Sequence, residues 1–104
     1  MPLTMIDDHP LHVDDEGFLT NYDEWNEDIA RSLANQIGIT LTTRHWEAIR
    51  FLRQDFKQRG ETATIRRIES AGGISVKEQF TLFPAKPAKK MAYIAGLPKP
   101  RGCV

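Results

Sequence analysis

The strongest constraint on the fold of this chain is an amphipathic pattern between Thr42 and Gly60. Large apolar residues recur there at about the spacing of helical turns: Trp46, Ile49, Phe51, Leu52 and Phe56. Thr42 is a favoured N-cap residue, and Gly60 is a typical helix stop. The pattern therefore predicts a long helix that buries one face against other elements.

A second amphipathic helix is predicted upstream of this one, with Gly38 as its stop. Its apolar positions recur at spacings of three and four: Tyr22, Trp25, Ile29, Leu33 and Ile37. Three shorter helices are predicted downstream. The first covers residues 61–70, the second starts at a capping box at Ser75 and runs to Phe83, and the third runs from Pro87 to a stop at Gly96.

The N-terminal part of the chain predicts a little β structure. Residues 1–10 mix Pro, Asp and His without periodicity and are interpreted as a loose leader. Residues 11–13 and 18–20 are apolar runs on either side of an acidic turn, which is typical of a hairpin. The predicted fold class is α+β and mainly helical, with a small N-terminal β meander or hairpin on a helix bundle and a flexible C-terminal arm.

Length and composition favour one soluble domain over residues 1–104, since 104 residues support a single small core. No apolar run approaches the roughly 20 residues of a membrane span, and the N-terminus lacks the pattern of a secretory signal. We therefore expect a cytoplasmic protein without membrane contact.

The net charge is zero but unevenly distributed. Residues 1–28 hold no Lys or Arg and nine acidic residues: Asp7, Asp8, Asp14, Asp15, Glu16, Asp23, Glu24, Glu27 and Asp28. From Pro84 onward the charged side chains are all basic: Lys86, Lys89, Lys90, Lys99 and Arg101. The cationic end is expected to lie against its own acidic half or an acidic partner, with solvated surface as the alternative.

The sole cysteine, Cys103, is one residue from the C-terminus, where neither core packing nor an internal disulfide explains it. An arm precedes it whose two prolines favour an extended backbone: Gly96, Leu97, Pro98, Lys99, Pro100, Arg101 and Gly102. A thiolate is a nucleophile that nearby cations stabilise. The pattern predicts that Cys103 accepts a sulfur atom as a persulfide and delivers it to another molecule. A bystander thiol is the alternative.

Other site types are less well supported. His9 and His12 lie among acidic residues but lack the spacing of a zinc site, so no metal and no cofactor is expected. His45 is interpreted as a surface or capping residue. A helix-turn-helix around Gly60 and Arg66 is an alternative, but the acidic half would be repelled by phosphates, so no tight direct nucleic-acid binding is expected.

The tail Gly-Leu-Pro-Lys-Pro followed by a penultimate cysteine resembles the DsrC/TusE family of sulfur-trafficking proteins. The resemblance extends through further segments: Gly17-Phe18-Leu19, Trp25, Gly38-Ile39, His45-Trp46-Glu47, Arg50-Phe51, Ile65-Arg66 and Leu82-Phe83-Pro84. It implies a small meander packed on a helix bundle, with a mobile arm over residues 97–104.

The resemblance also implies which branch of the family applies. DsrC-type members carry a second cysteine eleven positions before the last, where this chain has Ala92. The chain is therefore similar to the single-cysteine TusE type. That type implies a persulfide donor of the TusBCD or DsrEFH kind, and a thiouridylase acceptor of the MnmA kind that acts on the wobble uridine of tRNA. A divergent carrier of another, dissimilatory sulfur pathway stays an alternative.

The chain departs from the family pattern at three places. Lys86 stands where many members have Gly between two prolines, and Ala63-Thr64 stands where a Pro often precedes Ile-Arg. The segment 70–81 also looks shorter than in many relatives. These departures leave Cys103 unchanged but bear on which partner docks.

Overall fold

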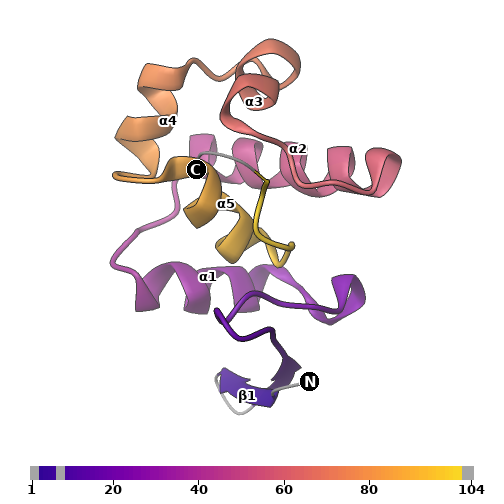
Figure 1. Ribbon diagram of the computed structural model, residues 1–104. Helices are drawn as coiled ribbons and strands as arrows, with labels where there is room; N and C mark the ends of the chain where they lie inside the picture. Colours follow the sequence, from indigo (N-terminus) through magenta and orange to yellow (C-terminus); the bar gives the residue numbers. More distant parts are fainter. Residues whose placement is uncertain (1–2, 7–8, 102–104) are drawn as a thin grey trace.

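The structure is a computed structural model that describes residues 3–6 and 9–101. Its elements in chain order are β1 (Leu3–Ile6), β2 (His9–His12), the 3-10 turn η1 (Tyr22–Glu24), α1 (Glu27–Gln36), α2 (Thr43–Arg59), α3 (Ile65–Gly72), α4 (Val76–Leu82) and α5 (Pro87–Ala95). Helix α5 lies between α1 and α2, while α3 and α4 lie beyond it (Figure 1). The predicted fold class, α+β and mainly helical, is confirmed.

The N-terminal β structure differs from its prediction. Part of the predicted loose leader is paired: β1 and β2 are antiparallel, with Leu3 opposite His12 and Ile6 opposite His9. The hairpin predicted between residues 11–13 and 18–20 is reduced to one bridge between Val13 and Leu19. Strand pairing joins residues that are not neighbours in sequence, and the weak alternation of this segment fits more than one register.

The predicted helix over residues 22–37 is interrupted. The side chain of Asn26 accepts a hydrogen bond from the backbone N–H of Ile29 at 2.9 Å and so starts α1. Asn21 likewise accepts from Asp23 at 3.1 Å and starts the separate turn η1. Trp25 therefore lies in an extended link between the two elements instead of on a helical face. Asparagine favours caps because its side chain substitutes for the missing backbone acceptor.

The four downstream helices are confirmed. Helix α2 begins after Thr42 and ends at Gly60, and α5 begins at Pro87 and ends at Gly96, as predicted. Helix α3 starts at Ile65, later than predicted, because Thr64 caps it by accepting from the Arg67 N–H at 3.3 Å. Local capping signals thus place most helix ends correctly.

The core is organised around α5, which is buried on nearly all sides. Its residues Met91, Ala92, Ile94 and Ala95 have no exposed surface. They pack with buried side chains of α2 and the α4–α5 link, including Ile49, Leu52 and Phe83. The last helix before the arm is therefore the most enclosed element of the described chain.

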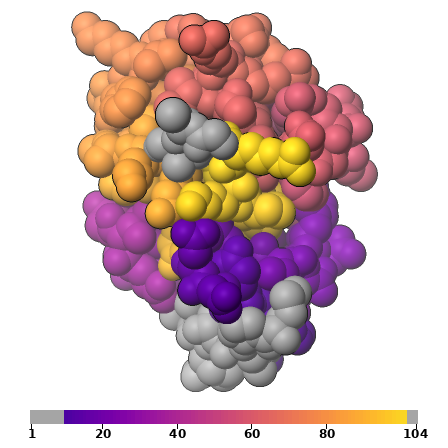
Figure 2. Space-filling view, in the orientation of Figure 1, coloured from indigo at the N-terminus to yellow at the C-terminus, as the bar shows by residue number. Residues whose placement is uncertain are grey.

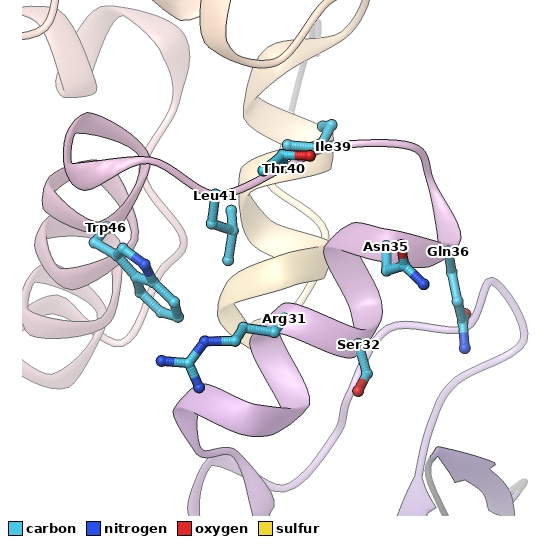
Figure 3. A pocket seen from close by; sticks show the side chains of 8 residues that line it. All are labelled: Arg31, Ser32, Asn35, Gln36, Ile39, Thr40, Leu41 and Trp46. Atoms are coloured by element: carbon cyan, nitrogen blue, oxygen red, sulfur yellow. The ribbon is translucent and has the colours of Figure 1, made fainter.

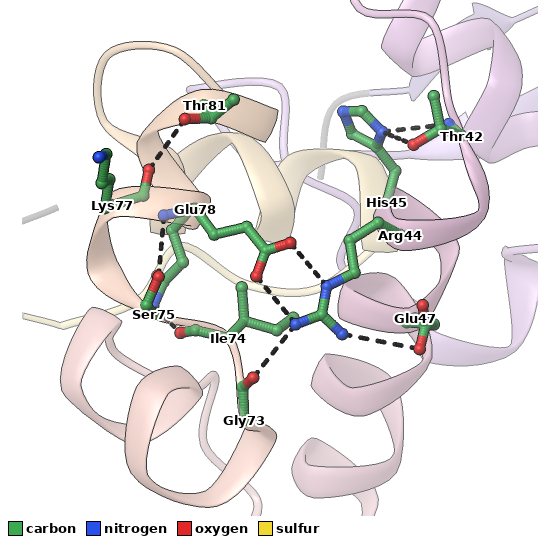
Figure 4. A network of polar contacts seen from close by, with 11 residues as sticks. Thr42, Arg44, His45, Glu47, Gly73, Ile74, Ser75, Lys77, Glu78 and Thr81 are labelled. Atoms are coloured by element: carbon green, nitrogen blue, oxygen red, sulfur yellow. Dashed lines mark hydrogen bonds and ion pairs between the residues drawn. The ribbon is translucent and has the colours of Figure 1, made fainter.

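Polar contacts join the outer helices to α2. Arg44 on α2 donates to both carboxylate oxygens of Glu78 on α4, at 2.8 and 2.9 Å, and to the Gly73 carbonyl at 3.2 Å (Figure 4). The hydrogen bonds from Arg44 hold the pKa of Glu78 below its ordinary value. Asp55, almost fully buried on α2, accepts from Arg67 on α3 at 2.8 Å. Bidentate and buried ion pairs of this kind fix helix orientation.

His45 is a buried capping residue, which confirms one of the two predicted roles and corrects the surface role. Its Nδ1 atom accepts from the Thr42 backbone N–H at 3.1 Å and lies 2.7 Å from the Thr42 hydroxyl oxygen (Figure 4). Its Nε2 atom lies 2.8 Å from the Leu82 carbonyl oxygen. Both ring nitrogens therefore have structural partners.

The link between α4 and α5 contains two strained residues. Ala85 and Lys86 have φ angles of +57° and +51°, in the left-handed region that residues with a Cβ atom seldom adopt. Lys86 is also the position at which many family members are expected to have glycine, and its conformation gives the reason.

We expect Lys86→Gly to raise the free energy of unfolding by about 0.5–1 kcal/mol, because glycine adopts this conformation freely and is a better N-cap residue for α5. Urea unfolding followed by circular dichroism measures the change. Lys57→Gly inside α2 is the control and should destabilise the protein by about 1 kcal/mol.

Candidate functional site

The candidate arm begins in a tightly packed region at the end of α5. Gly96 caps α5 with a φ of +70°, and a Cβ atom placed there would lie 2.5 Å from Cδ1 of Trp25 and 3.0 Å from Cδ1 of Leu19. The backbone N–H of Leu97 donates to the Ala92 carbonyl at 3.0 Å, and the Leu97 side chain is fully buried. Only glycine fits both the conformation and the space at position 96.

Trp25 and Arg53 bind the last carbonyl groups of α5. The Trp25 indole N–H donates to the Ile94 carbonyl at 2.9 Å. The Arg53 guanidinium donates to the Ala95 carbonyl at 2.8 Å and to the Tyr22 carbonyl at 2.9 Å. These donors satisfy helix-end carbonyls that have no partner within the helix.

Arg53 lies against aromatic rings, and it forms no ion pair with a carboxylate among the described residues. Its Cζ atom lies 3.8 Å from the ring centroid of Tyr22 and 4.1 Å from that of Trp25. Burial lowers the pKa of Arg53, yet an arginine stays protonated at physiological pH. A cation at a helix C-terminus is favourable because the carbonyl ends carry partial negative charge. We call Tyr22, Trp25, Arg53 and Gly96 the arm root.

The first residues of the arm lie against the fold. The Thr62 hydroxyl donates to the Pro98 carbonyl at 2.7 Å, and the Lys99 ammonium lies 3.2 Å from the Glu16 carboxylate. Pro100 is buried. Residues 97–100 are therefore in contact with the domain, and the mobility expected for residues 97–104 stays a prediction.

The Lys99–Glu16 pair confirms the expectation that the cationic end lies against the acidic half of the chain. The yellow C-terminal segment runs across one face of the molecule, between the indigo N-terminal residues and the pink and red helices (Figure 2). Arg101 is exposed at the end of the described arm. Cys103, the predicted carrier residue, lies outside the described residues, as does Gly102.

Described residues line three hollows of different size. One of about 200 Å³ lies under the arm and includes Thr62, Pro98 and Arg101. One of about 320 Å³ lies beside α5. The largest of these three, about 500 Å³, lies between α1 and Trp46 (Figure 3).

The hollow at Trp46 is polar along its α1 side. The Arg31 guanidinium lies 5.3 Å from the centroid of the Trp46 ring and also pairs with Asp28 at 2.8 Å. Because the arginine charge is already balanced by a carboxylate, this hollow presents little net charge to a ligand.

Residues of the less favoured site types have partners within the described part of the chain. His12 lies 2.6 Å from Glu24, whose pKa its backbone and side-chain hydrogen bonds lower. No group of three metal-ligating side chains occurs within the part of the chain that the structure describes. In the helix pair around Gly60, Arg67 is paired with Asp55, while Arg66 is exposed.

The sequence predicts Gly96 as the end of the last helix, but it does not predict the hydrogen bonds that Trp25 and Arg53 donate to that helix end. The hydrogen-bond partners of Arg53, Ala95 and Tyr22, lie 42 and 31 residues away in sequence. No local pattern signals such a contact. Asn26, a favoured N-cap residue, is a sequence signal that separates Trp25 from the helix that follows.

A family profile described as "DsrC like protein" matches residues 5–104. The chain belongs to this DsrC-like family. Among its relatives, the sulfurtransferase TusE of Photorhabdus laumondii is 38% identical and matches over 100% of both chains. The match to sulfurtransferase TusE of Escherichia coli is 35% identical and covers 90% of this chain and 93% of the relative.

Solved structures of DsrC-like proteins share this fold. The NMR structure of Allochromatium vinosum DsrC is 35% identical, with a TM-score of 0.85 over 98% of this chain and 97% of that one. The family resemblance predicted from the tail motif is therefore confirmed, and the chain sits among proteins named for sulfur transfer. Within the described residues, no helix combines the length and apolarity needed to cross a membrane.

Proposed function

We propose that this protein is a sulfur carrier that accepts persulfide sulfur on Cys103 and passes it on, in the relay that makes wobble 2-thiouridine in tRNA. The observation that carries the proposal is the position of the sole cysteine, seven residues beyond a glycine that is fixed between Trp25 and Leu19. Relatives named sulfurtransferase TusE support the same role.

The transfer is a thiol exchange without net oxidation. The Cys103 thiolate attacks the outer sulfur of a donor persulfide, a new S–S bond forms, and the donor cysteine leaves as a thiolate that takes up a proton. Cys103 then holds the persulfide. In the second step an outside thiolate attacks that outer sulfur and Cys103 leaves as the thiolate.

The chain supplies no second thiol for an internal disulfide, since Ala92 stands where DsrC-type members are expected to carry the other cysteine. Sulfur therefore has to leave to another protein. A TusBCD-type or DsrEFH-type donor and an MnmA-type thiouridylase are the proposed partners, with tRNA bound by the acceptor. A cytoplasmic location fits a thiol that must stay reduced.

Incubating the purified protein with a protein persulfide donor of the TusBCD type should add one sulfur atom to Cys103, and a reductant should remove it. Mass spectrometry of the intact chain and of its C-terminal peptide measures this. Cys103→Ser should accept none. If Cys103→Ser gains sulfur equally well, the carrier proposal is wrong.

A relocated thiol gives the matched control. Ser70 is exposed on α3, so Ser70→Cys in the Cys103→Ser background provides an accessible thiol away from the arm. It should accept sulfur from a small-molecule persulfide but at least 10-fold more slowly from the protein donor. Equal rates from the protein donor would show that the arm has no role.

The pathway is tested in the native host by deleting the gene and measuring wobble 2-thiouridine in tRNA. We expect its loss, with recovery by the wild-type gene and not by Cys103→Ser. Unchanged 2-thiouridine together with persulfide transfer to Cys103 would favour the alternative of a carrier in a dissimilatory sulfur pathway.

A further inference from the structure

A hollow beside α5 combines an apolar floor with a lysine rim. Phe18, Ile37 and Tyr93 form the floor, and the rings of Phe18 and Tyr93 meet edge to face with centroids 5.9 Å apart. Its rim includes three lysines and one acidic residue: Lys86, Lys89, Lys90 and Glu16. We call this hollow of about 320 Å³ the lysine pocket.

The charges of the lysine pocket are only partly balanced within the chain. Lys90 donates a hydrogen bond to the Pro84 carbonyl and so supports the link before α5. Glu16 is paired with Lys99 of the arm at 3.2 Å. Lys86 and Lys89 form no ion pair among the described residues, so two cations remain above an apolar floor.

One of these cations is held in a strained conformation. Lys86 has a φ of +51°, next to Ala85 at +57°, in a backbone region that glycine adopts without cost. Strain of this kind persists where the surrounding structure enforces it and often marks a functional position. A lysine at such a position contributes its charge to the pocket rim, which glycine would not do.

The size and charge of the pocket favour a short acidic peptide over a nucleic acid. The hollow accommodates one or two apolar side chains, and the two lysines complement one or two carboxylates next to them. A nucleic acid would need a continuous basic stripe, whereas the rim is interrupted by Glu16 and the neighbouring acidic turn that contains Asp14 and Asp15.

The pocket also adjoins the arm, because Glu16 lines the pocket and contacts Lys99. Cys103 follows Lys99 by four residues, which span at most about 14 Å. A segment bound in the lysine pocket would therefore bring its own protein within reach of the thiol.

We propose that the lysine pocket is the docking site for an acidic segment of a partner protein, with one apolar side chain on the Phe18–Tyr93 floor and carboxylates on Lys86 and Lys89. This proposal deepens the proposed function, since it assigns the surface by which a sulfur donor or acceptor recognises the carrier. It predicts binding independently of whether Cys103 carries sulfur.

The test is an NMR titration of the full chain with the peptide acetyl-Asp-Glu-Leu-Asp-Glu-amide. Changes in chemical shift should be confined to residues of the lysine pocket, among them Phe18, Ile37 and Tyr93. The double variant Lys86→Gly/Lys89→Gln should raise the Kd about 5–10-fold, as expected for the loss of two exposed ion pairs. Lys57→Gln on α2 is the matched control and should leave the Kd unchanged.

Two further peptides separate the contribution of the acidic side chains to binding from that of the leucine. Replacing the acids by Asn and Gln should weaken binding as much as the double variant does, and replacing Leu by Ala should weaken it further. No shifts at the pocket, or shifts that the lysine variants leave unchanged, would overturn the proposal. Stronger binding of a single-stranded RNA oligonucleotide at the same residues would overturn the choice of occupant.

Sulfur transfer separates this proposal from the carrier function. The double variant should take sulfur from a small-molecule persulfide at the wild-type rate, because Cys103 is intact, while its half-saturating concentration with the protein donor rises about 5–10-fold. If the wild-type protein takes sulfur from neither donor, the carrier function is wrong. The peptide titration then decides by itself whether the lysine pocket binds an acidic segment.

Discussion

Gly96→Ala should lower the free energy of unfolding by about 2–4 kcal/mol. The alanine methyl group would lie 2.5 Å from Cδ1 and 2.9 Å from Cγ of Trp25, closer than non-bonded carbons approach. Overpacking of this kind costs about 1–3 kcal/mol, and the left-handed backbone adds about 1–2 kcal/mol for a residue with a Cβ atom. Urea unfolding followed by circular dichroism measures the loss.

Gly38→Ala is the matched control for this substitution. Gly38 also has a positive φ, +74°, but a Cβ atom built there meets no other atom within 4 Å. It should cost only the backbone contribution of about 1–2 kcal/mol. The difference between the two variants measures the contact with Trp25, and equal losses would show that the arm root is not tightly packed.

Arg53→Met should lower the free energy of unfolding by about 2–3 kcal/mol. Methionine keeps much of the aliphatic packing but leaves the Ala95 and Tyr22 carbonyls without their donor, and each unsatisfied buried acceptor costs about 1–3 kcal/mol. Loss of the contacts with the Tyr22 and Trp25 rings adds about 0.5–2 kcal/mol. Because Arg53 is partly exposed, the expected total loss of stability lies at the lower end of the sum of these two contributions.

Two further variants show whether the geometry of Arg53 matters. Arg53→Lys keeps the charge but lacks the planar fork that reaches both carbonyls, so it should recover less than half of the loss. Arg50→Met removes a more exposed arginine from the same helix and should change stability by less than about 0.5 kcal/mol. A full rescue by lysine would mean that charge alone holds the arm root.

The helices were predictable because their ends are set by neighbouring residues. Thr42, Pro87 and Gly96 act within one helical turn, and the structure places α2 and α5 where these residues predict. The interruption at Trp25 was missed because apolar spacing continued through it, while Asn26 offered a competing cap. Periodicity alone does not distinguish one helix from a turn followed by a helix.

The site was predictable only in part. Cys103 and the Pro-Lys-Pro segment could be proposed as a site because a lone thiol near a chain end has few structural explanations. The contacts that fix the segment could not, since Thr62 reaches Pro98 across 36 residues and Lys99 reaches Glu16 across 83. Such pairs depend on how whole helices pack, which no local pattern encodes.

The contacts along residues 97–100 change what limits the encounter between the carrier and its partners. Only one residue, Gly102, lies between Arg101 and Cys103, so the Cα atom of Cys103 stays within about 7 Å of the Cα atom of Arg101. If Cys103 carries sulfur as proposed, this short tether confines the sulfur to a small volume. It raises the effective concentration of the sulfur at a partner surface bound beside α5 and nearly abolishes encounters elsewhere. Selectivity in the relay would then depend on which proteins bind the face beside α5. The thiol itself would react with any bound protein that places its reacting sulfur within reach of the tether.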